Sequence, residues 1–471
     1  MAFKSRFFLQ NNARWRMAMS LLAAAAAWSA VSPAACGADI PMEAFTCHTS
    51  TKAAEDVAVG PDGRVWVASD GGIMVIREGR VEGKLTRQNG LVHNNVHRIA
   101  LGPDGRMWVA TSGGVCSLSD RGWRHYTVKD GLTDEYATTV AVDSRSRVFV
   151  GTRRGACALA ADGRHFEPLD DAHEHARRCV HDIFAAQDGS VWFAKENGLT
   201  RLLPDGRWQS FRADPMIATG RGEIVGKHVF AVLADRSGLI WIGTERGAGV
   251  FDGARWRRFS SGNSLVGMGG PLCDFVSCLA EDASGCIWMG YGDAAEGVSC
   301  VSNGVWKSLG PGAGFSGCHV RRIASDRRGG LWMAGWAGIV RVGDEGIARI
   351  EEFGELPDNH VVSIRRKGNG SIMIRTATGL AFFHEGRRMS DEDAAIAEKL
   401  PDHAIEGAVR VELREHSVFL MIPGRSRMEK ATLAGKDFPA WVTALCWESG
   451  TVVWIGTASE GAIRMDLSLA K

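Results

Sequence analysis

The chain has 471 residues and a formal net charge of +1 at pH 7, with 55 basic and 54 acidic side chains interspersed along it. This balance argues against the single-sign surface that binds nucleic acid or an anionic membrane, and we predict neither as a partner. After the N-terminal segment we find no linker, low-complexity stretch or shift in composition. We therefore expect a single folded unit over residues 39–471.

Residues 1–38 have the composition of a secretory signal peptide. Basic residues come first, followed by an apolar run over residues 17–31 and small residues up to Ala38; the basic residues are Lys4, Arg6, Arg14 and Arg16. The apolar run is too short to cross a membrane comfortably, which favours a signal cleaved after Ala35 or Ala38. Cys36 leaves a lipoprotein anchor as the alternative. No second long apolar segment follows, so we predict a periplasmic or secreted protein without a membrane span.

Eleven cysteines are present, and ten remain if a signal peptide containing Cys36 is removed. An even number in an exported chain permits disulfides. Cys116, Cys157 and Cys446 fall in strand positions and are predicted to be small buried side chains. Cys273 and Cys318 lie in loops that enter neighbouring units, and they form our candidate disulfide. No Cys-x-x-Cys pair occurs, which argues against a structural zinc site or a thioredoxin-like motif.

One motif recurs about ten times with a period of about 40–50 residues, most clearly over residues 102–114 and 237–247. Each unit predicts four short strands, and units of this kind must stack because none can bury its apolar faces alone. The pattern predicts an all-β propeller. A large side chain recurs in the second strand and is predicted to pack between blades. These key positions are Trp66, Trp108, Phe149, Trp192, Trp241, Trp288, Trp332, Met373 and Trp454.

The first strand of each unit begins 12 residues before its key position, without insertion, in nine units. Those starting residues are Ala54, Val96, Ala137, Val180, Val229, Val276, Val320, Val361 and Val442. About two repeat lengths separate Met373 from Trp454, and a degenerate unit around residues 418–421 would fill the gap. We therefore expect nine or ten blades, more than the four to eight usual for propellers.

The last unit has only three predicted strands, which end near Met465. Residues 42–47 look like an unpaired fourth strand ahead of the first complete unit. Pairing the two would close the ring and remove its exposed edges. We predict a single closed propeller over residues 39–471 whose last blade is completed by this N-terminal strand.

Several stretches resemble the two-component regulator propeller repeat: residues 89–96 (Asn-Gly-Leu-Val-His-Asn-Asn-Val), 126–132 (Tyr-Thr-Val-Lys-Asp-Gly-Leu), 140–143 (Val-Ala-Val-Asp), 148–152 (Val-Phe-Val-Gly-Thr) and 240–244 (Ile-Trp-Ile-Gly-Thr). The resemblance covers nearly the whole mature chain. It implies a periplasmic propeller of the kind that forms the ligand-binding sensor part of hybrid histidine kinases, often for carbohydrates. No transmembrane, kinase, receiver or DNA-binding segment follows the last predicted blade, so we expect only the binding role to carry over.

Histidines are concentrated at two positions of the repeat. His97 and His181 lie 11 residues before their key positions, whereas His228, His319 and His360 lie 13 before theirs. Residues two apart on a strand project to the same side, which predicts one cluster at the mouth of the central channel. The same positions also hold Glu55, Tyr136, Cys179 and Trp441. Long connections that suit recognition lie on this face, over residues 212–227, 260–274, 310–317 and 390–406.

Two explanations of this cluster remain open. The histidines hydrogen-bond neighbouring blades as polar tips of a packed ring, or they contact a polar ligand or hold a metal. His173-Glu-His175, beside Asp170 and Asp171, suggests either a metal site or a solvated charged loop. We find no nucleophile elbow, no phosphate-binding glycine loop and no paired carboxylates with meaningful spacing. No catalytic residue or cofactor is therefore assigned.

The sequence thus favours an exported, non-catalytic propeller that binds a small polar ligand, such as a glycan fragment, or a partner protein on its loop-rich face. The candidate ligand-binding residues are His97, His181, His228, His319, His360, Glu55, Tyr136 and Trp441. A lyase or hydrolase that uses the channel-mouth histidines is the first alternative. A scaffold in an envelope assembly is the second.

Overall fold

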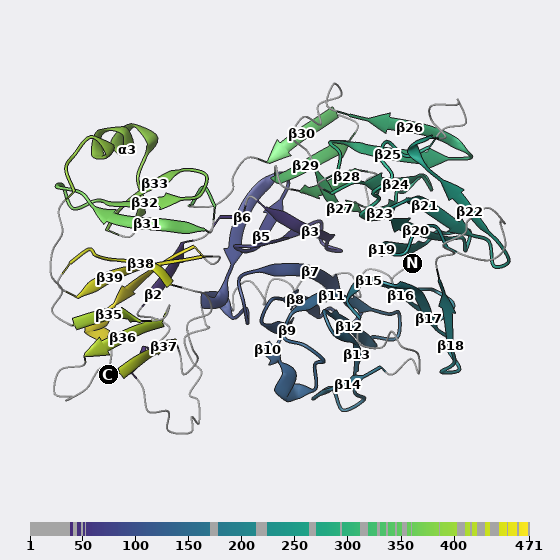
Figure 1. Cartoon of the computed structure of the whole chain (residues 1–471), viewed down its shortest axis with the longest axis horizontal. Helices are drawn as coiled ribbons and strands as arrows, with labels where there is room; N and C mark the ends of the chain where they lie inside the picture. Colours follow the sequence, from purple (N-terminus) through teal and green to yellow (C-terminus); the bar gives the residue numbers. More distant parts are fainter. Residues whose placement is uncertain are drawn as a thin grey trace, which may run out of the picture.

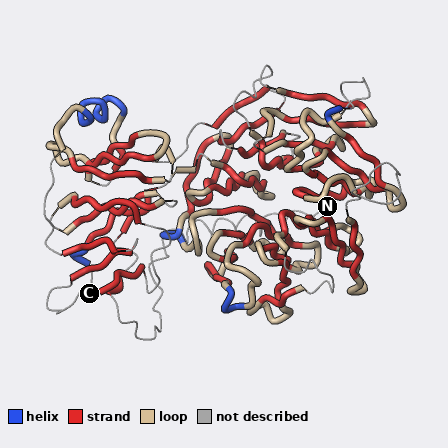
Figure 2. The backbone as a smooth tube through the Cα atoms, viewed as in Figure 1, coloured by secondary structure: helices blue, strands red, loops and turns tan. Residues whose placement is uncertain are grey.

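The computed structural model describes the chain from residue 38 to residue 469 with internal gaps. The gaps are residues 41–44, 49, 52, 170–177, 213–223, 263–269, 293, 311–318, 327–329, 336–337, 344–345, 351–355, 359, 386, 403–409, 415–416, 422–428, 434–441, 450 and 459–460. The predicted signal peptide therefore lies outside the described residues, apart from its last residue. Strands dominate the described chain (Figure 2), and they form ten four-stranded sheets. The predicted all-β class is confirmed.

Seven of these sheets, here called blades 1 to 7, follow one another along the chain. Blades 1 and 2 are β3 (Ala54–Val59), β4 (Val65–Ser69), β5 (Gly72–Arg77), β6 (Arg80–Leu85), then β7 (Val96–Leu101), β8 (Met107–Thr111), β9 (Gly114–Ser119) and β10 (Gly122–Tyr126). Blades 3 and 4 are β11 (Ala137–Val142), β12 (Val148–Thr152), β13 (Gly155–Leu159), β14 (Phe166–Pro168), then β15 (Val180–Ala185), β16 (Val191–Lys195), β17 (Gly198–Leu202) and β18 (Trp208–Phe211). Blade 5 is β19 (Val229–Ala234), β20 (Ile240–Thr244), β21 (Gly247–Phe251) and β22 (Trp256–Phe259). Blades 6 and 7 are β23 (Cys278–Glu281), β24 (Ile287–Gly290), β25 (Val298–Ser302), β26 (Val305–Leu309), then β27 (Val320–Ser325), β28 (Leu331–Gly335), β29 (Gly338–Gly343) and β30 (Gly346–Ile350).

These seven blades form a closed circuit around their first strands (Figure 1). Each first strand contacts the first strand of the next blade, and β27 of blade 7 contacts β3 of blade 1. Trp332 of blade 7 shares a buried apolar cluster with Val57 and Val67 of blade 1. The junction between blades 7 and 1 is therefore packed in the same way as the junctions between consecutive blades.

The remaining three sheets form a separate group, here called the three-sheet unit. Its strands are β1 (Ala38–Ile40), β2 (Phe45–His48), β31 (Val361–Arg366), β32 (Ile372–Thr376), β33 (Leu380–His384), β34 (Arg387–Arg388), β35 (Arg410–Arg414), β36 (Ser417–Met421), β37 (Glu429–Leu433), β38 (Val442–Trp447), β39 (Val452–Thr457) and β40 (Ala462–Asp466). Helix α3 (Asp391–Glu398) follows β34. As predicted, β2 completes the last sheet, antiparallel to β40, and β1 pairs in parallel with β37.

The predicted number of sheets is right, but the single ring of nine or ten blades is corrected by these contacts. Seven blades close on themselves, and β31 contacts β38 and β39 instead of extending the ring. Trp454 packs against Phe383, with 5.1 Å between ring centroids, as Trp332 packs against blade 1. The three-sheet unit is built from residues 38–50 and 356–469, and the ring from residues 54–350.

The key side chains pack between blades as predicted. Trp108 is 1 % exposed and stacks on Tyr126 at 5.6 Å, while Phe166 of blade 3 contacts both rings edge-on. Cys116 and Cys157 are buried in the blade cores as predicted, whereas Cys446 is only partly buried, which corrects the prediction for that residue. Cys273 is a free thiol, and its proposed partner at position 318 lies outside the described residues.

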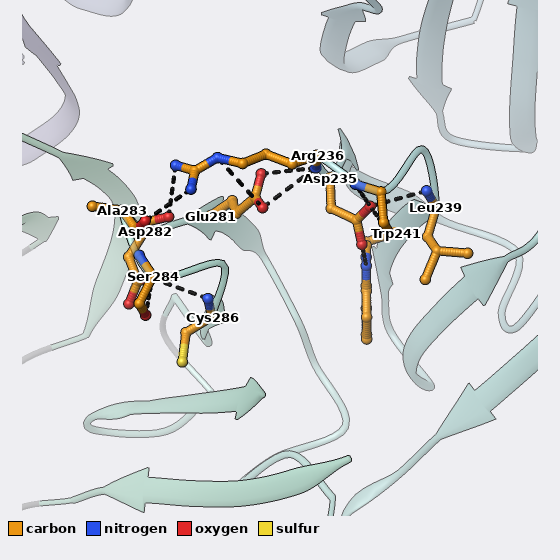
Figure 3. A network of polar contacts seen from close by, with 10 residues as sticks. Asp235, Arg236, Leu239, Trp241, Glu281, Asp282, Ala283, Ser284 and Cys286 are labelled. Atoms are coloured by element: carbon orange, nitrogen blue, oxygen red, sulfur yellow. Dashed lines mark hydrogen bonds and ion pairs between the residues drawn. The ribbon is translucent and has the colours of Figure 1, made fainter. Parts of the chain in front are cut away.

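An aspartate six residues before the key tryptophan closes the turn between the first two strands in several blades. Asp235 accepts hydrogen bonds from the backbone of Leu239 and from Nε1 of Trp241, at 3.0 and 2.8 Å (Figure 3). Arg236 in the same turn reaches blade 6, where it bonds Glu281 and the carbonyl oxygens of residues 282 and 283. This network lies at the ends of the first strands opposite to those considered next.

Candidate functional site

A cavity of about 690 Å³ opens where the first strands of the seven blades begin. Its volume lies within the range usual for small-molecule sites. Every blade contributes the residue 11 positions before its key side chain: Glu55, His97, Thr138, His181, Phe230, Ser277 and Arg321. Tyr136, Phe275, Arg98, Arg322, Gly292 and Ala294 complete the lining. The cavity is therefore built by the repeat itself, at one equivalent position in each blade.

A β-bulge at this position explains why these side chains reach the cavity. In six of the seven blades the pairing of the first two strands skips one residue, for example between Ala54 and Asp56 or between Val180 and Asp182. The skipped residue is the one that lines the cavity. A bulge leaves its extra residue outside the regular pairing and redirects its side chain. Side chains at the bulge are thus free to differ among blades without breaking the ladder.

Four of the predicted site residues, Glu55, His97, Tyr136 and His181, line this cavity together. Two more are adjacent to lining residues: the His228 ring lies 6.4 Å from the Phe230 ring, and His319 Nδ1 lies 3.1 Å from the carbonyl oxygen of Gly292.

Two predicted residues are not part of this group. His360 is an exposed residue directly before β31 in the three-sheet unit, so the expectation that it lies around the same mouth is corrected. Blade 7, which precedes His360 in the sequence, is the last blade of the ring, although the sequence repeat continues beyond it. Trp441 and the His173-Glu-His175 loop lie outside the described residues.

His97 is held in a stack of three side chains. Its ring lies 4.5 Å from the Tyr136 ring, whose other neighbour is the Arg153 guanidinium at 3.5 Å. Its Nε2 is 2.9 Å from the Ser112 hydroxyl. Burial lowers the pKa of His97 to about 4, and the nearby positive groups His93, Arg153 and Arg321 act in the same direction. His97 is therefore neutral at neutral pH.

His181 presents an unsatisfied nitrogen in the cavity wall. Its Nδ1 lies 4.0 Å from Cys179 Sγ, whereas the buried Nε2 has no hydrogen-bond partner among the described residues. Burial lowers the pKa of this histidine too. A buried polar atom without a partner costs free energy, and a ligand atom that bonds it removes that cost.

Three buried charges, Asp56, Arg98 and Asp182, and the partly buried Arg322 form the floor of the cavity. Arg98 contacts Asp182 directly and Asp56 at 3.6 Å, while Arg322 lies 3.3 Å from Asp56 and 3.5 Å from Asp182. They come from blades 2, 4, 1 and 7, so these ion pairs cross the centre of the ring. Each lies directly after the bulge, ten residues before its key position. Sequence reasoning missed them, although charges at one repeat position of an otherwise apolar strand were a usable signal.

The cavity walls differ in chemistry from one side to the other. Phe230 and Phe275 contact each other at 4.6 Å between centroids, and the His181 ring lies 5.2 Å from Phe230. At the junction of blades 7 and 1, Arg321 and Glu55 form an ion pair. Among the described residues, no group of three or more His, Cys, Asp or Glu side chains is arranged to hold a metal ion. The arrangement offers stacking, hydrogen bonding and ion pairing to a ligand.

The fold is a β-propeller. The cavity at the mouth of its central channel is the candidate site. A two-component regulator propeller model matches residues 90–113, which confirms the resemblance predicted from the sequence over that stretch. A comparison with curated proteins finds no match. No helix among the described residues is long and apolar enough to cross a membrane.

Solved propellers of several kinds are similar to this chain. A virginiamycin B lyase from Staphylococcus aureus is 13 % identical with a TM-score of 0.49, covering 65 % of this chain and 98 % of its own. The extracellular domain of a proposed one-component system from B. thetaiotaomicron is 13 % identical with a TM-score of 0.39, covering 88 % and 70 %. A gluconolactonase from Xanthomonas campestris is 15 % identical with a TM-score of 0.37, covering 66 % and 97 %. None of these scores reaches 0.5, so the fold is established by the sheets described above.

Proposed function

We propose that this protein is an exported, non-catalytic propeller that binds a small polar ligand at the channel mouth. The observation that carries the proposal is the convergence on a single cavity of one equivalent side chain from every blade of the ring, which lies at a bulge in six of the seven blades. A rigid ring with a variable set of side chains at one end is well suited to recognition. The predicted signal peptide supports export.

The polar groups of the cavity favour binding over catalysis. Its carboxylates are engaged by arginines: Glu55 by Arg321, and Asp56 and Asp182 by the floor arginines. Burial raises the pKa of the Cys179 thiol, so the sulfur beside His181 is not a thiolate at neutral pH. The aromatic wall and neutral imidazoles would accommodate a ligand such as a glycan fragment by stacking and hydrogen bonding. A partner protein that inserts a side chain would use the same groups.

One observation favours an enzyme as the second candidate. His181 lines a cavity large enough for a substrate, and burial keeps its ring neutral, as a general base requires. A lyase or hydrolase would lose turnover in His181→Ala while the fold is retained. Incubation with polysaccharide fragments followed by mass analysis of the products tests this candidate directly.

A thermal-shift screen against neutral glycans, amino acids and divalent metals tests the binding proposal, because a ligand that binds only the folded state raises the Tm. We expect a hit whose shift disappears in Phe230→Ala and His181→Ala. His165→Ala, an exposed histidine at the outer edge of blade 3, is the matched control and should keep the shift. A hit that survives both cavity variants would refute this assignment of the site. Recovery of an envelope protein that binds independently of the cavity would favour the scaffold.

A further inference from the structure

The cavity has two chemically different poles, which come from different blades of the ring. The Glu55–Arg321 ion pair lies at the junction of blades 1 and 7, and both side chains are about a quarter exposed (26 % and 25 %). Phe230 and Phe275 belong to blades 5 and 6, with His181 of blade 4 against Phe230. In the circuit of seven, blade 4 is furthest from the junction of blades 7 and 1, blade 5 is one blade nearer, and blade 6 adjoins blade 7. A ligand that spans the mouth therefore meets an ionic pole and an aromatic pole.

The charges that line the cavity and its floor cancel. Three guanidinium groups face three carboxylates, in the set Arg98, Arg321, Arg322, Glu55, Asp56 and Asp182. The two lining histidines are neutral because burial lowers the pKa of each. Burying a net charge against such a balanced surface would leave it uncompensated. The cavity therefore favours a ligand whose own net charge is zero.

A small polar ligand of zero net charge is either uncharged, as a polyol is, or a zwitterion. We propose that the cavity takes a zwitterion with an aromatic side group, such as an aromatic amino acid. Its carboxylate pairs with Arg321, its ammonium pairs with Glu55, and its ring lies against Phe230 and Phe275. This proposal rests on the proposed function and names the ligand class for the same cavity.

The Glu55–Arg321 ion pair at the rim is suited to an exchange in which each side chain pairs with the opposite charge of a zwitterion. A partly exposed pair contributes little stability, so replacing it by ligand contacts costs little. The planar guanidinium can bind a carboxylate through two parallel hydrogen bonds, and an ammonium offers three donors to a carboxylate. A zwitterion gives each rim charge a new opposite partner, whereas a sugar gives it only neutral hydroxyls. Opposite charges on adjacent blades thus favour the zwitterion over the polyol.

The aromatic pole adds the second requirement. Phe230 and Phe275 form a continuous apolar wall with His181, and aromatic pairs prefer the offset or edge arrangements that a third ring can join. The cavity of about 690 Å³ is large enough for an amino acid.

Calorimetric titration of the intact exported chain with L-tryptophan tests the proposal. We expect saturable binding to one site, and at least a tenfold weaker response to N-acetyl-L-tryptophanamide, which keeps the ring and lacks both charges. Maltotriose is the uncharged polyol for comparison. Binding of maltotriose but not L-tryptophan, lost in Phe230→Ala, would overturn the zwitterion while the proposed function stands. No binding of either compound would also overturn the zwitterion.

Variants separate the two poles. The double variant Glu55→Gln with Arg321→Met keeps the balance of charge, and we expect it to weaken L-tryptophan binding at least tenfold while leaving the N-acetyl amide unchanged. Phe230→Ala should weaken both compounds. The control is Arg207→Met, at an exposed ion pair in the turn before β18, the outer strand of blade 4, and it should change neither. L-tryptophan binding that is unchanged in the double variant would refute the ionic pole, whatever the effect of Phe230→Ala.

Discussion

Arg98 shows at the scale of one residue how the ring depends on buried charge. The side chain is held by Asp182 and Asp56, and its Nε donates to the Thr139 hydroxyl at 3.2 Å. The two aspartates also accept backbone N–H groups of neighbouring blades, at Ile99 and Val232. The floor thus joins blades that are not adjacent in the circuit.

Arg98→Met should destabilise the fold by about 3–5 kcal/mol, because it leaves two buried carboxylates facing one arginine. Denaturation in urea measures the change. Arg207→Met, which removes an exposed ion pair, should cost less than about 1 kcal/mol. Equal midpoints for the two variants would mean that the floor charges are solvated and do not stabilise the ring.

His97 makes stability depend on pH in a predictable direction. Its pKa falls from 6.5 in the unfolded chain to about 4 in the folded ring. Between these values only the unfolded chain binds the proton, so the free energy of unfolding decreases as the pH falls from 6.5 to 4. The total loss from this group is on the order of 3 kcal/mol, and above pH 6.5 its contribution is constant.

The variant His97→Gln should lose less stability than the parent across this window. The comparison of the two removes the contributions of all other titrating groups. Urea midpoints at pH 7 and pH 4.5 give the measurement. Identical pH dependence in both proteins would show that the pKa of His97 is the same in the folded and the unfolded chain.

At the scale of the element, the turn between the first two strands varies in its hydrogen bonding. In blade 7, Asp326 accepts from Trp332 Nε1 at 3.3 Å and contacts Arg341 at 3.6 Å. Blade 4 has Ala186 at the equivalent position, with the same turn from its backbone N–H to Ser190. There Trp192 Nε1 and the Nε of Arg201 are buried without hydrogen-bond partners among the described residues.

Ala186→Asp should therefore stabilise blade 4 by about 1–2 kcal/mol, because one carboxylate would satisfy two buried donors. The converse change, Asp235→Ala in blade 5, should destabilise by a similar amount through loss of the bond to Trp241. Both values follow from denaturant unfolding. Destabilisation by Ala186→Asp would mean that water already solvates the two donors or that the turn cannot accept a side chain.

At the scale of the whole molecule, the N-terminal strands belong to the three-sheet unit. β1 and β2 complete two of its sheets and pair with no strand of the ring. Deleting residues 39–48 should therefore lower the melting temperature of the three-sheet unit and leave the ring transition unchanged. Scanning calorimetry of the deleted chain, with ligand present, distinguishes the two transitions. A ring transition that shifts with the deletion would contradict the division into seven and three.

The repeat made the blades predictable but not their grouping. Strand starts and key side chains follow from local periodicity, and so did the pairing of β2 with β40. The ring closes at the blade that packs against blade 1. The repeat spacing does not show which blade that is, because the first strand begins 12 residues before the key side chain both at Val320 and at Val361. This is why His360 was grouped with residues of the ring. The bulge could not be predicted, because the alternation of side chains along a strand does not show which residue is left out of the pairing. The residues of the charged floor directly follow the bulge and were missed with it.

The two places where the chain passes between the ring and the three-sheet unit lie side by side. The Ser50 hydroxyl donates to the carbonyl oxygen of Pro357 at 3.4 Å, although the ring separates these residues in sequence. A short turn from residue 50 to residue 356 would therefore rejoin the three-sheet unit without the ring. The ring is thus an insertion in the three-sheet unit, and its two ends are adjacent. Exchange of the coding segment for residues 51–355 would replace the whole binding module and leave the three-sheet unit intact.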